Sequence, residues 1–235
     1  MKYMGSKARH AKDILPIILK DRKENQVYVE PFVGGFNILD KVRGPRIASD
    51  SNTYLIELFR MIQLGWEPPN FISEKQYLDI RDNKENYPIH LVGFVGFGCS
   101  YSGKWFGGYA RGNTSNGQPR NYCLESKKNI LKQKDKIQDV LIYNHIYNDL
   151  IIPENSIIYC DPPYEGTTEY KDKFNHKDFW NWCRYQAQSG NKIYVSEYNA
   201  PEDFTLLWSK EVNNSLTKNT GSKQGIEKLF TFYVS

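Results

Sequence analysis

The chain has 235 residues, enough to bury a full α/β core and to carry a smaller appended region. Lysine and arginine total 31 against 27 acidic residues, and the net charge of +4 permits a nucleic-acid partner without requiring one. The four cysteines form no C-x-x-C pair and have no histidine cluster beside them, which argues against a zinc site. No signal peptide or long apolar segment occurs, so we expect a cytoplasmic protein with reduced thiols and no membrane partner.

The first part of the chain alternates helices and strands. Ser6 is a candidate N-cap for the first helix. The periodicities predict helices over 8–20, 37–39 and 54–64, and strands over 27–30 and 46–50. This alternation is typical of a parallel sheet.

The pattern changes after Gly65. Between Gly93 and Gly117 the chain holds eight glycines, interleaved with aromatic residues. A short helical piece over residues 74–82 precedes them. Because this stretch lacks the alternation of strand and helix, we predict a loop-rich insertion at 65–125 in a core formed by 1–64 and 126–235.

Alternation resumes after the insertion. The predicted elements are helices over 126–136, 177–189 and 201–208, and strands over 140–144, 157–160, 192–197, 210–216 and 227–234. The last two strands would pair as a hairpin around residues 217–225.

Asp161-Pro162-Pro163-Tyr164 directly follows the strand predicted at 157–160. The two prolines end the strand, and ligands of open α/β sheets bind beyond the carboxyl ends of the strands. Pro163 favours an extended Pro162, which leaves the Pro162 carbonyl free to accept a hydrogen bond. Carboxylate, carbonyl and aromatic face together match the exocyclic amino group of a nucleobase. A polar turn with a packed tyrosine is the alternative interpretation.

A second candidate site lies at the first two strands. The segment from Glu30 to Gly35 ends a strand and opens a helix, where small residues let a ligand approach the backbone. It does not match G-x-G-x-x-G. Asp50, at the end of the next strand, could accept hydrogen bonds from both ribose hydroxyls of a nucleoside. Taken separately, the glycine pair could be a tight turn and Asp50 could be a helix cap. The placement of both at neighbouring strand ends favours a nucleoside site.

Five motifs occur in a fixed order: Tyr3-x-Gly5-x-Lys7, Glu30-Pro31-Phe32-x-Gly34-Gly35, Ser49-Asp50-x-Asn52, Asp161-Pro162-Pro163-Tyr164 and Val195-Ser196-Glu197-Tyr198. Together they resemble the Dam-type DNA adenine-N6 methyltransferases of the D12 class, over the chain outside 65–125. The resemblance implies a Rossmann-like, S-adenosylmethionine-dependent methyltransferase fold with a mixed sheet and a C-terminal hairpin. It also implies that the insertion recognises the target, in a bacterial or phage-infected cell.

The resemblance assigns roles to individual residues. S-adenosylmethionine would contact Tyr3, Lys7, Glu30, Phe32, Gly34, Asp50 and Asp161. Catalysis would involve Asp161, Pro162 and Tyr164. Nucleic acid would contact Ser102, Lys104, Trp105, Arg111 and Arg120 of the insertion, although a glycine-rich packing loop with solvated charges is the alternative there. Lys218, Lys223 and Lys228 near the hairpin could add contacts to the DNA backbone, although a solvated loop is the favoured alternative there.

The implied reaction is methylation of adenine N6 in double-stranded DNA at a short recognition sequence, with the base flipped out of the duplex. A cognate restriction enzyme is a candidate second partner. N4-cytosine methylation, RNA adenine methylation and a catalytically silent DNA-binding relative are the alternatives, and Asp rather than Ser at 161 favours adenine.

Three positions depart from the family pattern. Ser6 replaces a glycine that members commonly carry, and Glu197 replaces an asparagine or similar residue. Ile146 stands where members often have an acidic residue near the cofactor, with Asp149 displaced along the chain.

Overall fold

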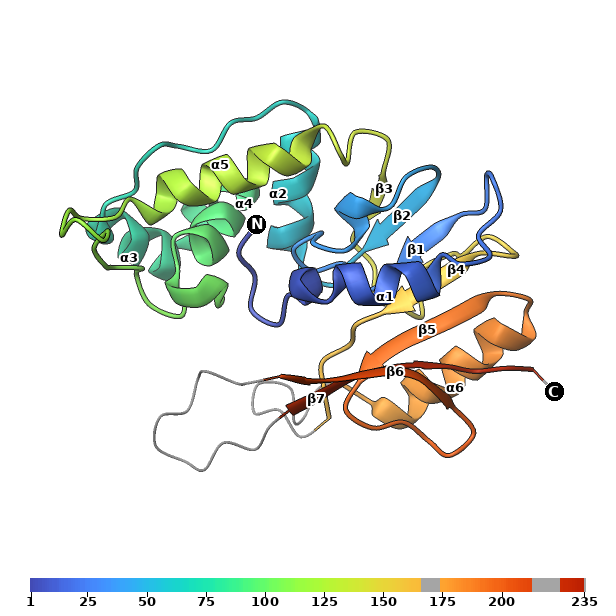
Figure 1. Cartoon of the computed structure of the whole chain (residues 1–235). Coiled ribbons are helices and arrows are strands. Elements are labelled where there is room, and N and C mark those ends of the chain that lie inside the picture. The colour runs from blue at the N-terminus through green and yellow to red at the C-terminus, as the bar shows by residue number, and fades with distance from the viewer. Residues whose placement is uncertain (166–173, 213–224, 235) are drawn as a thin grey trace.

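The computed structural model describes residues 1–165, 174–212 and 225–234 (Figure 1). The strands of this part are β1 (Tyr28–Glu30), β2 (Arg46–Ser49), β3 (Leu141–Tyr143), β4 (Ile157–Cys160), β5 (Lys192–Glu197), β6 (Thr205–Val212) and β7 (Gly225–Thr231). Its α-helices are α1 (Ala11–Ile18), α2 (Thr53–Gln63), α3 (Glu74–Asp82), α4 (Ile89–Gly93), α5 (Tyr122–Lys134) and α6 (His176–Gln188). Short helical turns complete it: η1 (Lys7–Arg9), η2 (Leu39–Lys41), η3 (Lys84–Asn86), η4 (Phe94–Gly98) and η5 (Tyr101–Gly103). Within these ranges no helix has the length and apolar character needed to span a membrane.

The strands form one mixed sheet in the order β3-β2-β1-β4-β5-β7-β6. The five strands from β3 to β5 are parallel, whereas β7 runs antiparallel to both β5 and β6. After β1, the chain adds β2 and then β3 on one side of β1, and β4 then pairs with β1 on its other side. The strand order therefore reverses between β1 and β4, and these neighbours form the switch point. This is the predicted Rossmann-like methyltransferase fold with its C-terminal hairpin. Its switch point is where such sheets bind ligands.

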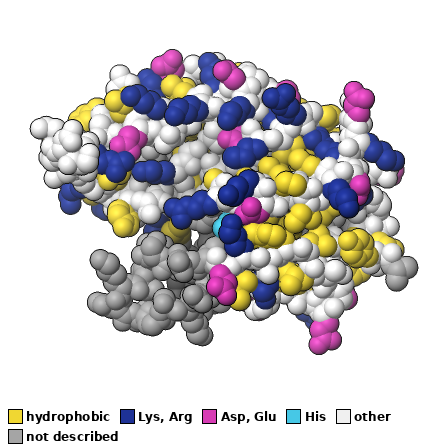
Figure 2. All heavy atoms as spheres, in the orientation of Figure 1, with side chains coloured by type: hydrophobic (Ala, Val, Ile, Leu, Met, Phe, Trp, Pro, Cys, Tyr) yellow, Lys and Arg dark blue, Asp and Glu magenta, His cyan; other side chains and the backbone are white. Residues whose placement is uncertain are grey.

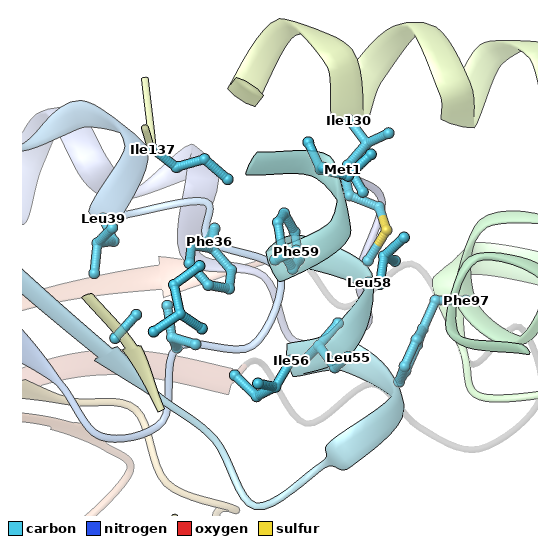
Figure 3. Packing of buried hydrophobic residues seen from close by; sticks show 14 of the residues in the cluster. Met1, Phe36, Leu39, Leu55, Ile56, Leu58, Phe59, Phe97, Ile130 and Ile137 are labelled. Atoms are coloured by element: carbon cyan, nitrogen blue, oxygen red, sulfur yellow. The ribbon is translucent and has the colours of Figure 1, made fainter. Parts of the chain in front are cut away.

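Each face of the sheet packs on its own apolar core, because successive side chains of a strand point to opposite faces. Tyr28 belongs to the core that holds α1, α2, α4 and α5. Val29 belongs to the core that holds α6. Figure 3 shows the first core around Phe36 and Phe59, whose ring centroids lie 4.0 Å apart. This contact joins the turn after β1 to α2 and so fixes the loop that opens the ligand edge.

The prediction that the glycine-rich stretch is mainly loop is wrong for its first part. Residues 89–98 form α4 and η4, and Phe94 and Val95 are fully buried. A Cβ on Gly93 would lie only 2.2 Å from the Tyr54 carbonyl oxygen. Glycine at this position therefore lets α4 approach α2 more closely than a larger residue would allow. The helix α5 also begins at Tyr122, inside the predicted insertion.

The predicted helix over 201–208 is also wrong, because β6 occupies residues 205–212. Strand pairing overrides the helical spacing of the apolar residues: Trp208 pairs with Leu229, and a register irregularity lies between Leu206 and Trp208. The hairpin itself is confirmed. Its predicted loop up to residue 224, with Lys218 and Lys223, lies outside the described residues.

The other predicted elements agree with the structure to within a few residues. Ser6 is an N-cap as expected, but it caps η1, where its Oγ accepts a hydrogen bond from the Ala8 N–H. The longer predicted helix is divided into η1 and α1. The predicted helical segment after Gly35 is the short turn η2, two residues later than expected.

Candidate active site

A cavity of about 940 Å³ opens beyond the carboxyl ends of β1 and β4. Its walls come from the N-terminal segment, the turns after β1, β2 and β4, the loop after β3, and β7. The volume falls in the range of pockets that enclose a small organic ligand. The predicted residues in its wall are Tyr3, Lys7, Glu30, Phe32, Gly34, Asp50, Lys104, Asp161, Pro162 and Tyr164. The structure therefore brings every predicted cofactor-binding and catalytic residue into one pocket.

Asp50 ties the second strand to the turn after the first. Its Oδ2 accepts a hydrogen bond from the Gly34 N–H at 3.0 Å, and its Oδ1 accepts one from the Asn52 N–H at 2.9 Å. Burial raises the pKa of Asp50, although these two N–H groups act in the opposite direction. Asn52, rather than Asp50, caps α2 by accepting from the Leu55 N–H. The Asp50 carboxylate is thus fixed in place with lone pairs left for a ligand.

The glycine turn is closed by the ring of Tyr3. A Cβ on Gly34 would lie 2.8 Å from Tyr3 Cε1, and one on Gly35 would lie 2.8 Å from Tyr3 Cβ. Gly34 also has φ of +50°, which disfavours other residues. Both glycines are therefore needed for Tyr3 to pack on this turn.

Lys7 lies at the end of the pocket that holds Asp161, and its side chain is only 8% exposed. Its Nζ is 3.4 Å from Asp161 Oδ1 and 3.3 Å from Glu227 Oε2. The same ammonium lies 4.2 Å from the centroid of the Tyr164 ring. Tyr164 in turn donates its hydroxyl to Glu227 Oε2 at 2.8 Å. One cation therefore links two carboxylates and an aromatic ring.

The charges of this cluster are set by burial and by mutual contact. Burial alone would lower the pKa of Lys7, but Asp161 and Glu227 outweigh it and raise the pKa above its ordinary value. Burial raises the pKa of Asp161 to about 6, although Lys7 opposes the shift. Above that pH, Asp161 is a carboxylate that accepts hydrogen bonds, beside a charged Lys7.

Glu30 and Phe32 form the wall next to this cluster. Glu30 is fully enclosed and accepts a hydrogen bond from the Tyr28 hydroxyl at 2.9 Å. Burial raises the pKa of Glu30 well above its ordinary value, although the hydrogen bond from Tyr28 opposes the shift. Phe32 stacks on Tyr147 with ring centroids 5.4 Å apart. These contacts shape the pocket wall beside the turn after β4.

Glu197, whose role the sequence left open, supports the turn after β4 from behind. It is 2% exposed, and its carboxyl oxygens accept hydrogen bonds from the Glu165 N–H at 3.2 Å and the Tyr198 N–H at 2.7 Å. Burial raises the pKa of Glu197 to about 7, although both N–H groups oppose the shift. Glu197 therefore links β5 to Glu165, the residue that follows Tyr164.

Replacing Glu197 with glutamine is expected to remove a pH dependence of stability. The folded chain holds the Glu197 proton more tightly than the unfolded chain, so the free energy of unfolding falls as pH rises from 4.5 to about 7. Urea unfolding at pH 5 and pH 8 should show a shallower fall for Glu197→Gln than for the wild type. The exposed Glu202→Gln serves as control and should keep the wild-type slope. An unchanged slope in Glu197→Gln would contradict this role.

The other predicted nucleic-acid residues lie outside the pocket wall. Arg111 pairs with Glu74, and Arg120 pairs with Glu125 at 2.6 Å. Ser102 is exposed. Trp105 is half-buried and packs against three rings, those of Tyr54, Phe97 and Phe106. Its packing thus agrees with the alternative of a glycine-rich packing segment.

The prediction missed several residues of the pocket wall, among them Tyr147, Tyr198 and Glu227. Glu227 lies on β7 two positions before the buried Leu229 and so on the same face of the sheet. A charged residue on the inward face of a strand was the signal that could have identified it. Ile146 lines the pocket, as its alignment with the family's acidic position suggested, whereas Asp149 does not.

The sheet order and the pocket at its switch point define an α/β protein with a Rossmann-like sheet. A model of the D12 class N6 adenine-specific DNA methyltransferases matches residues 3–96. The match agrees with the class that the ordered motifs predicted, and it covers less than half of the chain. The narrower Dam-type assignment stays a prediction.

One relative resembles the chain along its whole length. The type II methyltransferase M.FokI from Planomicrobium okeanokoites is 22% identical over an alignment of 282 residues, which includes 100% of this chain and 43% of M.FokI. The chain thus spans less than half the length of this relative.

Among solved structures, the tRNA (m1A58) methyltransferase TrmI from Aquifex aeolicus matches with a TM-score of 0.41 and 10% identity, over 95% of this chain and 69% of TrmI. TrmN from Thermus thermophilus matches with a TM-score of 0.39 and 11% identity, over 96% of this chain and 48% of TrmN.

Proposed function

We propose that this protein transfers a methyl group from S-adenosylmethionine to the N6 amino group of adenine in double-stranded DNA, at a short recognition sequence. One observation supports the proposal above all others. A single pocket at the switch point holds a fixed carboxylate suited to a nucleoside, Asp50, and an acceptor suited to an amino group, Asp161. The D12 class match agrees with both the donor and the acceptor.

The residues at the Asp50 end fit S-adenosylmethionine. The Asp50 carboxylate is held by two N–H groups and retains lone pairs for ribose hydroxyls. Gly34 and Gly35 keep the backbone open beneath the ring of Tyr3. When bound, S-adenosylmethionine supplies an electrophilic methyl group on a sulfonium.

The residues at the Asp161 end would act on the amino group. The Asp161 carboxylate and the Pro162 carbonyl accept hydrogen bonds from the two N–H groups of this amine. These bonds favour a nitrogen whose lone pair is directed out of the base ring. Tyr164 supplies an aromatic wall for a base that has rotated out of the duplex. Position and electrostatics then accelerate the transfer, without a covalent enzyme intermediate.

DNA would approach over the insertion, which we propose as the target-recognition region. Lys104 lies in the pocket wall, and Ser102, Arg111 and Arg120 are exposed on neighbouring parts of the insertion. Figure 2 shows Lys and Arg side chains gathered over the part of the molecule that holds α5, next to the insertion. Such side chains suit phosphate contacts. A restriction enzyme of the same specificity is the candidate second partner.

The proposal is tested by expressing the chain in a host that lacks other DNA methylases. Single-molecule sequencing of the genomic DNA should reveal N6-methyladenine within one short sequence. N4-methylcytosine, or methylated adenine in RNA alone, would favour the corresponding alternative. Absence of any methylation together with failure to bind S-adenosylmethionine would indicate a silent relative and contradict the proposal.

A further inference from the structure

Glu227 reaches the catalytic end of the pocket from the last strand of the sheet. Its side chain is 13% exposed, and it contacts both Lys7 Nζ and the Tyr164 hydroxyl. Lys7 and Glu227 are 220 positions apart in the sequence. The two contacts join the N-terminal segment, β7 and the turn after β4 at one carboxylate.

The charge balance of this cluster depends on Glu227. With both acids ionised, Asp161 and Glu227 contribute two negative charges against the one positive charge of Lys7. Without Glu227, Lys7 and Asp161 would form a neutral pair. A buried ammonium near the reacting centre repels a second cation, and this repulsion is strong where water is largely excluded.

A cationic donor therefore needs the additional acid. S-adenosylmethionine carries a positive sulfur, whereas its product S-adenosylhomocysteine carries a neutral one. An excess negative charge beside Asp161 favours the first over the second. It also leaves Asp161 free to accept from an amino group, because Glu227 shares the contact with Lys7.

We propose that Glu227 is a positioning residue that holds Lys7 and Tyr164 and gives the pocket the negative charge that selects a sulfonium donor over its neutral thioether product. The inference rests on the proposed function and deepens it. It assigns to the C-terminal hairpin a part in cofactor discrimination as well as in completing the sheet.

The test compares the binding of two ligands to Glu227→Gln by titration calorimetry. Glutamine has nearly the same shape and can still accept from the Tyr164 hydroxyl, but it lacks the charge. S-adenosylmethionine should bind about tenfold more weakly, and S-adenosylhomocysteine should change by less than about twofold. Glu211→Gln is the matched control, since Glu211 lies exposed on the paired strand β6 and its loss removes the same charge away from the pocket.

Equal changes in the two dissociation constants, or no change, would overturn the inference. Glu227→Asp supplies a second test, because it keeps the charge while shortening the reach. It should preserve the wild-type ratio of the two constants even where turnover falls, and a ratio that collapses in this variant would equally overturn the inference. If the wild type methylates adenine but Glu227→Gln keeps the wild-type ratio of the two dissociation constants, only this inference fails. If the wild type binds neither ligand, the proposed function fails.

Discussion

Replacing Asp161 with alanine is expected to lower the rate of methyl transfer by about a thousandfold, the scale on which one preorganised hydrogen-bond partner acts in a transition state. The carboxylate is fixed 3.4 Å from Lys7 and is ionised above a pH of about 6. Its loss removes the acceptor of the amino group and leaves Glu227 as the acid that the described residues place beside Lys7. Single-turnover assays on a DNA duplex that carries the recognition sequence would measure the rate.

Asp149→Ala is the matched control for this experiment. Asp149 is an exposed acid on the loop after β3, and it does not line the pocket. Its replacement should leave the rate within about twofold of the wild type, as surface changes usually do. Near-normal turnover in Asp161→Ala would refute the proposed role of the motif.

Replacing Gly93 with alanine is expected to destabilise the protein by about 3 kcal/mol, at the upper end of the usual cost of overpacking. The added Cβ would lie 2.2 Å from the Tyr54 carbonyl oxygen and 3.3 Å from Leu58 Cβ. The obstacle is backbone, so α4 must move away from α2. Urea unfolding monitored by circular dichroism would measure the loss.

Gly98→Ala provides a graded comparison in the same helical stretch. There the new Cβ would meet side chains alone among its nearest atoms, Ser126 Cβ at 3.1 Å and the Phe94 ring at 3.3 Å. A smaller loss of stability is expected because a side chain can shift more readily than a helix backbone. Equal midpoints for Gly93→Ala and the wild type would show that α2 and α4 are not held at this distance.

Local motifs predicted the sheet and most of the pocket because they lie at strand ends. Asp50 and Asp161 each follow a short buried strand, and the parallel order of these strands brings both to one edge. The order of the motifs along the chain therefore carried three-dimensional information.

Features that depend on contacts between segments far apart in the sequence could not be predicted from such motifs. Glu227 enters the pocket because β7 pairs with β5 in the register that places Lys228 opposite Glu197. Trp105 is enclosed by rings that come from α2, from η4 and from the adjacent residue. Neither the strand at 205–212 nor the helices at 89–98 had a local pattern strong enough to outweigh the competing one.

The contact between Lys7 and Glu227 has a consequence for the order in which the protein is made. The ribosome synthesises Glu227 only after Lys7 and the 219 residues between them, because the two are 220 positions apart. The nascent chain can form β1 to β5 while Lys7 still lacks the contact with Glu227. Since β7 inserts between β5 and β6, late and non-local strand pairing completes the pocket. The pocket therefore gains its contact with Glu227 only after β7 has been synthesised and has paired with β5.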